Sequence, residues 1–144
     1  GDNQVRDLGA VSLQCGRRVD SLKWFLDWKF FGKAGFARMM EHELDLCRYA
    51  ELIVRQSPQL DLVYPRSAFN ICFRYRPEEA DAGPFNLALR NTLYHQGISL
   101  VGYAQNSDGP FLRLLLASHD LEKQDVDQYF SQVIDTGKRL EEEH

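Results

Sequence analysis

The segment from Val19 to Phe31 is apolar on nearly every side, and it constrains the fold more than any other part of the chain. Eight of its thirteen residues are apolar, and four of these form the aromatic pairs Trp24/Trp28 and Phe30/Phe31. A helix of this kind must be covered on most sides, and a chain of 144 residues has a limited interior. We therefore expect the segment to belong to something larger: a missing portion of the same chain, a second subunit, or both.

The composition is that of an ordinary globular protein, with 44% apolar and 26% charged residues. The length fits one domain, or one domain plus a piece of another. A net charge of −4 argues against a nucleic-acid-binding protein. The three widely spaced cysteines, Cys15, Cys47 and Cys72, indicate reduced thiols and a cytoplasmic location. We expect neither a signal peptide nor a membrane span.

Periodicity and turn residues predict an α+β fold, with helices packed on one face of a small, mostly antiparallel sheet. The expected elements are a loop over 1–18, helices over 20–32, 36–56, 85–96 and 121–141, and strands over 60–64, 69–75, 98–105 and 111–117. Gly32 and Gly35 form a hinge-like joint between the first two helices. We place a domain boundary there, which divides the chain into residues 1–34 and 35–144.

Arg113 is the strongest candidate for a binding residue, because it interrupts an otherwise apolar strand, Phe111–Leu116. Alternation puts it on the face of Phe111 and Leu115, where burial of a guanidinium is costly unless an anion pairs with it. The anion is either an internal carboxylate or the carboxylate of a ligand, and an arginine that reaches solvent at the sheet edge is a third reading.

Other chemically active side chains give weaker indications. Cys15 lies between Gln14 and Gly16 close to two arginines, so it is either a reactive thiol or a small residue packed at an interface. The four histidines lack the spacing of metal ligands, and we predict no metal site. From the residues alone the chain has no complete active site.

Several segments resemble the C-terminal part of the group II pyridoxal-phosphate-dependent amino-acid decarboxylases. The first is Gln14-Cys15-Gly16-Arg17-Arg18-Val19-Asp20, which is similar to the family's Gln-Cys-Gly-Arg-Arg/His-Val-Asp. Asn70-Ile71-Cys72-Phe73-x-Tyr75-x-Pro77 is similar to Asn-Val-Cys-Phe-Trp-Tyr-x-Pro. Val101-Gly102-Tyr103 and Phe111-Leu112-Arg113 resemble two late strands of the family. The matches keep their order over nearly the whole chain.

The resemblance implies a homodimeric fold-type I enzyme, with residues 1–34 from the end of the large domain and 35–144 as the small C-terminal domain. It places Arg113 at the position that binds the substrate carboxylate, and Gln14, Cys15 and Gly16 on a loop near the active site. The Gln-Cys-Gly sequence of that loop resembles the members that act on an acidic substrate such as glutamate or cysteine sulfinate. The cofactor lysine would lie upstream of Gly1, so we expect no catalytic residue in this chain and no activity of the chain alone.

Two alternatives to this function stay open. In the first alternative, the chain is a non-catalytic α+β module for ligand binding or association. In the second, it belongs to a decarboxylase of diaminobutyrate or of aromatic amino acids. The expected partners are an amino-acid substrate, pyridoxal phosphate in the full-length enzyme, and a second subunit bound through the large domain. Neither nucleic acid nor a membrane is expected as a partner.

Overall fold

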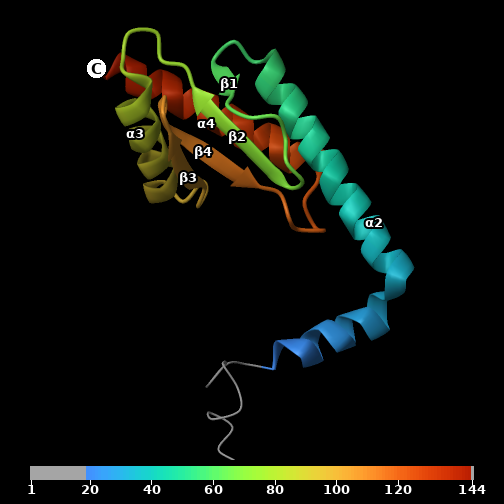
Figure 1. Ribbon diagram of the computed structural model, residues 1–144. Coiled ribbons are helices and arrows are strands. Elements are labelled where there is room, and N and C mark those ends of the chain that lie inside the picture. The colour runs from blue at the N-terminus through green and yellow to red at the C-terminus, as the bar shows by residue number, and fades with distance from the viewer. Residues whose placement is uncertain (1–18, 144) are drawn as a thin grey trace, which may run out of the picture. The chain divides into compact units, whose positions relative to one another are not determined.

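The computed structural model describes residues 19–143, and its elements follow the order that the sequence predicts. They are helix α2 (Asp20–Gln56), strands β1 (Leu60–Leu62) and β2 (Asn70–Tyr75), helix α3 (Ala82–His95), strands β3 (Gly102–Asn106) and β4 (Gly109–Leu115), and helix α4 (Lys123–Glu142) (Figure 1). The two helices expected over 20–32 and 36–56 are both present within α2. They are separated at Gly32, whose φ of 61° and ψ of 180° are not helical. Gly35 is helical, so the predicted joint is confined to Gly32.

The last two strands begin at positions other than those predicted. β3 begins at Gly102 rather than at residue 98, because the backbone N–H groups of Ile98 and Ser99 donate to the Leu93 carbonyl at 3.0 and 3.4 Å. They close the end of α3 instead of pairing in the sheet, and Gly97 permits this ending with a φ of 69°. β4 starts at Gly109, directly after a two-residue turn from Asn106.

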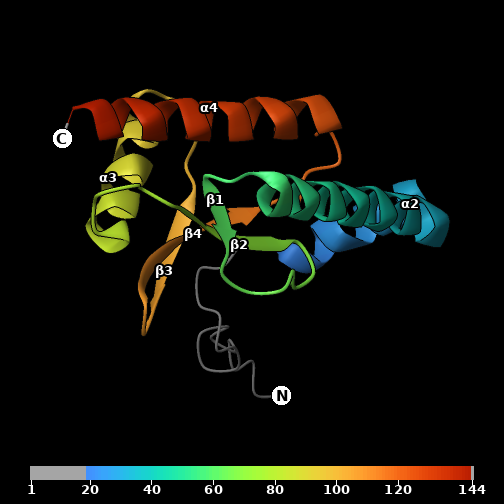
Figure 2. The same ribbon diagram turned by 90° about the horizontal axis from the view of Figure 1, so that it is seen from above.

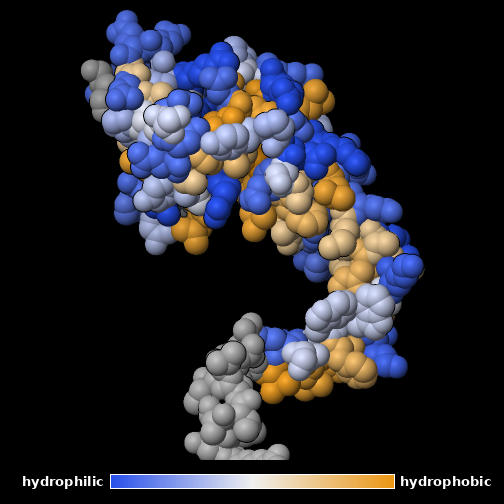
Figure 3. All heavy atoms as spheres, in the orientation of Figure 1, coloured by the Kyte–Doolittle hydropathy of each residue, from blue (hydrophilic) through white to orange (hydrophobic). Residues whose placement is uncertain are grey.

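The chain divides into two compact units, residues 1–37 and residues 38–144. In the first unit, the rings of Trp24, Trp28 and Phe36 lie within 5.1–5.6 Å of one another. Large apolar side chains nevertheless remain at its surface, including Phe25 at 55% and Phe30 at 83% exposure. Figure 3 shows them as orange spheres over the first part of α2. The expectation that this helix needs further cover agrees with these exposures.

The second unit is built on a four-stranded antiparallel sheet with the strand order β1-β2-β4-β3. Ile71, Phe73 and Tyr75 alternate along β2 and are almost completely buried, as predicted. The core that they join contains Leu46, Cys47, Ala50 and Val54 of α2, Phe85, Leu89 and Leu93 of α3, and Val126, Phe130 and Val133 of α4. Figure 1 shows α4 behind the sheet, and Figure 2, seen from above, shows it along one side of the sheet. The predicted α+β architecture is confirmed.

Side chains alternate along β2 and β4, so the residues between the core-facing ones lie on the opposite side of the sheet. We call this side the open face, and its residues in the two central strands are Asn70, Cys72, Arg74, Phe111, Arg113 and Leu115. The C-terminal end of β2 is held by polar contacts from α3. Asn86 of α3 both accepts from the Tyr75 N–H at 2.8 Å and donates to the Tyr75 carbonyl at 2.9 Å. These paired bonds hold the C-terminal end of β2 against α3.

Candidate functional site

Arg113 lies in the middle of β4 on the open face, and its side chain is exposed. The expectation of a buried guanidinium is therefore wrong. Arg113 shares the face of Phe111 and Leu115 as predicted, but no helix of the second unit packs on that face, and Leu115 is 59% exposed. The charge is consequently solvated, and it needs no internal anion to compensate for burial.

The neighbours of Arg113 leave room for a ligand beside its guanidinium. Cys72 of β2 pairs with it on one side and Gly102 of β3 on the other. An added Cβ at Gly102 would lie 3.9 Å from Arg113 Nε, so no side chain separates the guanidinium from the β3 backbone. Burial raises the pKa of the Cys72 thiol, and the Arg113 cation lowers it by a smaller amount. Cys72 is thus a neutral thiol next to the cation.

No hydrogen bond or ion pair occupies the Arg113 guanidinium among residues 19–143. The described arginine–carboxylate pairs join other residues: Arg48 with Asp45, Arg55 and Arg66 with Glu51, and Arg76 with Asp61. Five N–H donors in a planar fork are therefore available on the open face. Their geometry suits a carboxylate, which accepts two parallel hydrogen bonds from such a fork.

A cavity of about 400 Å³ adjoins Arg113. Its walls include Asn70, Gly102 and Arg113 together with Ser99, from the segment after α3, and Tyr129 of α4. The hydroxyl oxygens of Ser99 and Tyr129 are shielded from solvent, so they do not face the open space of the cavity. Arg113 is therefore the charged group that the described lining offers to a ligand.

Arg74 is a second cation on the open face, and three hydrogen bonds hold its guanidinium in place. It donates to the Pro110 carbonyl at 2.9 Å, the Gly109 carbonyl at 2.7 Å and Asn106 Oδ1 at 2.6 Å. It also lies 6.0 Å from the centre of the Phe111 ring. Arg74 therefore fixes the turn between β3 and β4. Arg74 lies two residues after Cys72 in β2, so alternation along the strand would have placed it on the same face.

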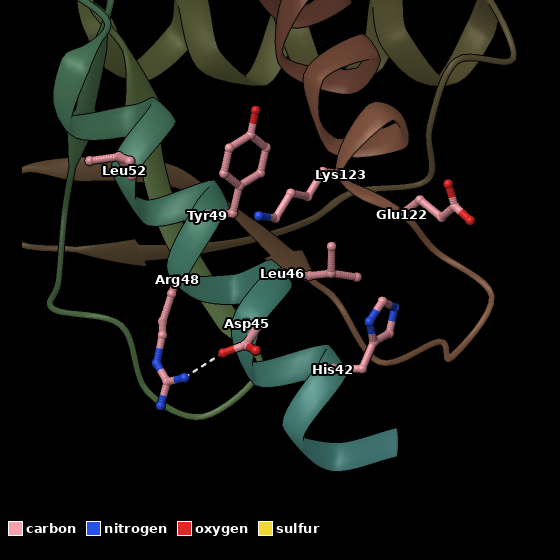
Figure 4. A pocket seen from close by; sticks show the side chains of 8 residues that line it. All are labelled: His42, Asp45, Leu46, Arg48, Tyr49, Leu52, Glu122 and Lys123. Atoms are coloured by element: carbon pink, nitrogen blue, oxygen red, sulfur yellow. Dashed lines mark hydrogen bonds and ion pairs between the residues drawn. The ribbon is translucent and has the colours of Figure 1, made fainter. Parts of the chain in front are cut away.

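A second cavity, of about 650 Å³, lies elsewhere, between α2 and the start of α4 (Figure 4). Its polar side chains already have partners. His42 Nε2 lies 2.7 Å from the Leu121 carbonyl, and Tyr49 donates to Asp127 at 2.6 Å. The Lys123 ammonium lies 5.2 Å from the centre of the Tyr49 ring. These contacts join the two helices, and they leave no unpaired group aimed at a ligand.

Three of the residues proposed from the sequence, Gln14, Cys15 and Gly16, lie outside the described residues. Within residues 19–143 no group of three His, Cys, Asp or Glu side chains is arranged to hold a metal ion. In the same range, no helix has the length and apolar content required to cross a membrane.

Comparison with known proteins decides the family. The family model described as the pyridoxal-dependent decarboxylase conserved domain matches residues 2–76, which is more than half of the chain. The chain belongs to this family. Among curated members, it is 32% identical over 123 residues to an L-aspartate decarboxylase of Metarhizium robertsii, covering 80% of this chain and 24% of that protein. It is 30% identical to a glutamate decarboxylase-like protein of Gibberella zeae, covering 95% and 28% of the two chains.

Solved structures of the family have the same fold. Mouse CSAD superposes with a TM-score of 0.79 at 27% identity, over 91% of this chain and 30% of that chain. A rice TDC structure with PLP gives a TM-score of 0.80 at 22% identity, over 94% and 30% of the two chains. The likeness confirms the predicted α+β portion of a fold-type I enzyme. The chain thus spans about a quarter of the length of the curated relatives that it matches.

Pyridoxal phosphate is the cofactor of the family. The burial of this chain's lysines bears on whether one of them could bond covalently to it. The five lysines are Lys23, Lys29, Lys33, Lys123 and Lys138, and all of them are exposed. A lysine that bonds covalently to a carbonyl is normally desolvated or placed beside another cation. Because all five are exposed, none of them is desolvated.

Proposed function

We propose that this chain is the C-terminal part of a pyridoxal-phosphate-dependent decarboxylase of an acidic amino acid, and that Arg113 binds the substrate's α-carboxylate. The observation that carries the proposal is the exposed guanidinium of Arg113, which has no partner among residues 19–143 and lies on the open face of the sheet. The fold around it is similar to that of mouse CSAD. Arginine suits the role better than lysine, because its planar fork fixes the orientation of a carboxylate as well as attracting it.

The names of the relatives support the acidic substrate class. The chain is similar to an L-aspartate decarboxylase, to a glutamate decarboxylase-like protein and, at 28% identity, to the human acidic amino acid decarboxylase GADL1. A diaminobutyrate decarboxylase and the tryptophan decarboxylase of Catharanthus roseus are structural neighbours at 24% and 21% identity, which supports the fold alone. We therefore assign glutamate, aspartate or cysteine sulfinate ahead of diaminobutyrate or tryptophan.

We also infer the organisation of the complete enzyme. Residues 1–34 are assigned to the end of the large domain, and 35–144 to the small C-terminal domain. The exposed apolar side chains of the first unit support a homodimer formed through the large domain. The free thiols of Cys47 and Cys72 support a cytoplasmic location, where amino-acid metabolism takes place under reducing conditions.

The test is a decarboxylation assay on the protein expressed from its complete reading frame, with pyridoxal phosphate and a panel of amino acids. We expect release of CO2 from acidic amino acids and little or none from tryptophan or 2,4-diaminobutyrate. Absence of CO2 release from every amino acid would overturn the enzymatic proposal. Release from diaminobutyrate or tryptophan alone would overturn the substrate assignment.

Arg113→Ala in the same protein tests the role of the guanidinium. Truncating one partner of a close charge pair commonly weakens an interaction by several kcal/mol, so we expect kcat/KM to fall roughly 10²–10³-fold. Absorbance of the bound cofactor should stay unchanged, and Arg113→Lys should recover part of the loss, because lysine restores the charge without the fork. Arg48→Ala, which removes an exposed cation paired with Asp45, is the matched control. An unchanged kcat/KM in Arg113→Ala would contradict the assignment.

A further inference from the structure

Gly102 is a glycine that the fold of the described residues does not require. Its φ lies outside the left-handed region, so other residues can adopt its backbone conformation. A Cβ added at Gly102 would lie 3.6 Å from the Arg113 carbonyl oxygen and 3.9 Å from Arg113 Nε, and these are ordinary van der Waals distances. Each of the other glycines among residues 19–143 either has a positive φ or would place a Cβ within 3.2 Å of another atom.

Glycine at this position also weakens the sheet. Gly102 begins β3, which is an edge strand, and a glycine there contributes no side-chain packing and loses more conformational freedom on folding than any other residue. A branched residue would suit the strand better. A glycine in a strand often marks a place where a ligand or another backbone approaches closely. The residue type at 102 therefore indicates that some group approaches the β3 backbone at this point.

The charged group nearest to this gap is the guanidinium of Arg113. Gly102 and Arg113 are paired across β3 and β4, so a side chain at 102 would lie on the open face next to that of Arg113. The Cβ atoms of such a pair are normally about 5 Å apart, and a side chain at 102 larger than a methyl group would therefore cover the guanidinium from the β3 side. Cys72 holds the corresponding place on the β2 side. The guanidinium is thus more accessible over Gly102 than over Cys72.

The composition of the surrounding surface favours an anionic ligand as the approaching group. Gly102 and Arg113 both line the cavity of about 400 Å³, and no Asp or Glu belongs to its lining. Small-molecule sites span roughly 300–1,000 Å³, so an amino acid fits within this space. The guanidinium has no hydrogen-bond or ion-pair partner among residues 19–143, and its free donors suit a carboxylate better than an uncharged segment of protein.

We propose that Gly102 contacts the substrate, and that the carboxylate held by Arg113 lies over the β3 backbone at Gly102, in the space that a side chain would occupy. The inference rests on the proposed function for the part played by Arg113, and it adds the residue that makes room for the substrate beside the guanidinium. Gly102 acts through the absence of a side chain rather than through a bond. A residue larger than alanine at this position excludes the carboxylate.

The experiment measures binding of glutarate, a dicarboxylate without an amino group, by isothermal titration calorimetry. The protein is expressed from its complete reading frame. Gly102→Ala should bind glutarate within about twofold of the starting protein, because a Cβ fits beside Arg113. Gly102→Val should bind it at least about tenfold more weakly, since the two methyl groups cost the carboxylate a hydrogen bond to the guanidinium. Arg113→Gln should abolish binding.

Ala104→Val is the matched control. Ala104 lies two residues after Gly102 in β3 and is paired with Phe111, so the variant places the same side chain on the same face but away from the guanidinium. It should leave glutarate binding unchanged. Thermal unfolding of Gly102→Val, in the complete protein and in the 144-residue chain, should have an unchanged or higher midpoint, because valine favours a strand. Weaker binding without loss of stability separates a substrate contact from a merely structural role.

Undiminished glutarate binding by Gly102→Val, an equal loss in Ala104→Val, or no glutarate binding by the complete protein would each overturn the proposal. A lower unfolding midpoint of Gly102→Val in the complete protein alone would assign the gap to a packed segment of protein, and would overturn it as well. If only Arg113→Gln loses glutarate, the role of Gly102 is wrong and the carboxylate-binding role of Arg113 stands. If every variant behaves as expected and the complete protein releases no CO2, the contact at Gly102 stands and the decarboxylase proposal fails.

Discussion

At the scale of single residues, α4 approaches β2 very closely at Gly137. A Cβ added to Gly137 would lie 2.3 Å from Tyr75 Cε2, well inside van der Waals contact. The Tyr75 ring has little freedom to move away, since it stacks on Phe85 at 5.3 Å and donates from its hydroxyl to Glu141 at 2.8 Å. Glycine is therefore required at this position although it lies inside a helix.

The substitution Gly137→Ala tests this packing. Alanine gains about 1 kcal/mol over glycine in a helix interior, whereas overpacking a core costs about 1–3 kcal/mol. We expect the clash to dominate, with a net loss of roughly 1–2 kcal/mol in the free energy of unfolding, measured by urea denaturation. Ser131→Ala, at an exposed position of α4, should stay within about 0.5 kcal/mol of the starting chain. A more stable Gly137→Ala variant would show that the Tyr75 ring is free to move.

The candidate site shows what residue patterns predict and what they leave open. Alternation along residues 111–116 correctly grouped Arg113 with Phe111 and Leu115. It did not tell which face of the strand the helices cover, so burial of Arg113 was predicted wrongly. Phe111 is buried although it lies on the open face, because the Tyr64 ring, 5.6 Å away, covers it together with Arg74. Such cover comes from distant segments and is invisible in the strand itself.

At the scale of elements, the β3–β4 hairpin depends on a residue of a third strand. Arg74 of β2 makes three hydrogen bonds to the turn, and Asn106 Oδ1 accepts both from Arg74 and from the Asp108 N–H at 3.1 Å. Period-two patterning and the Asn-Ser-Asp-Gly turn were sufficient to predict the hairpin. The capping of α3 by residues 98 and 99 was not predictable, because apolar residues there suit a strand equally well.

Arg74→Ala should loosen the hairpin more than the rest of the sheet. Loss of three hydrogen bonds to a charged, part-buried group should cost about 2 kcal/mol of stability. Hydrogen exchange of the paired amides in residues 102–113 should rise by about tenfold more than that of α4 amides. Arg76→Ala is the control, because Arg76 forms an exposed pair with Asp61, and such pairs contribute about 0–1 kcal/mol. Equal acceleration of exchange across the whole unit would contradict a local role for Arg74.

At the scale of the whole molecule, the chain has a carboxylate-binding candidate, Arg113, but no desolvated lysine among residues 19–143. Its fold class and element order were predictable, since they depend on periodicity that each segment carries by itself. The cover of residues 20–31 was not, because many of their apolar side chains stay exposed among residues 19–143. The same limit applies to the chemistry, because Arg113 is a candidate for recognition only.

The 144-residue chain alone should therefore release no CO2 from any amino acid. With all five lysines exposed, none has the desolvated setting that makes a lysine amine reactive toward a carbonyl near neutral pH. Incubation with pyridoxal phosphate should produce only weak, non-stoichiometric Schiff-base absorbance, spread over several lysines after borohydride reduction and peptide mapping. The complete protein, reduced in parallel, should show one labelled lysine at a stoichiometry near one. Stoichiometric labelling of a single lysine in the 144-residue chain, or release of CO2 by it, would show that these residues form a cofactor site on their own.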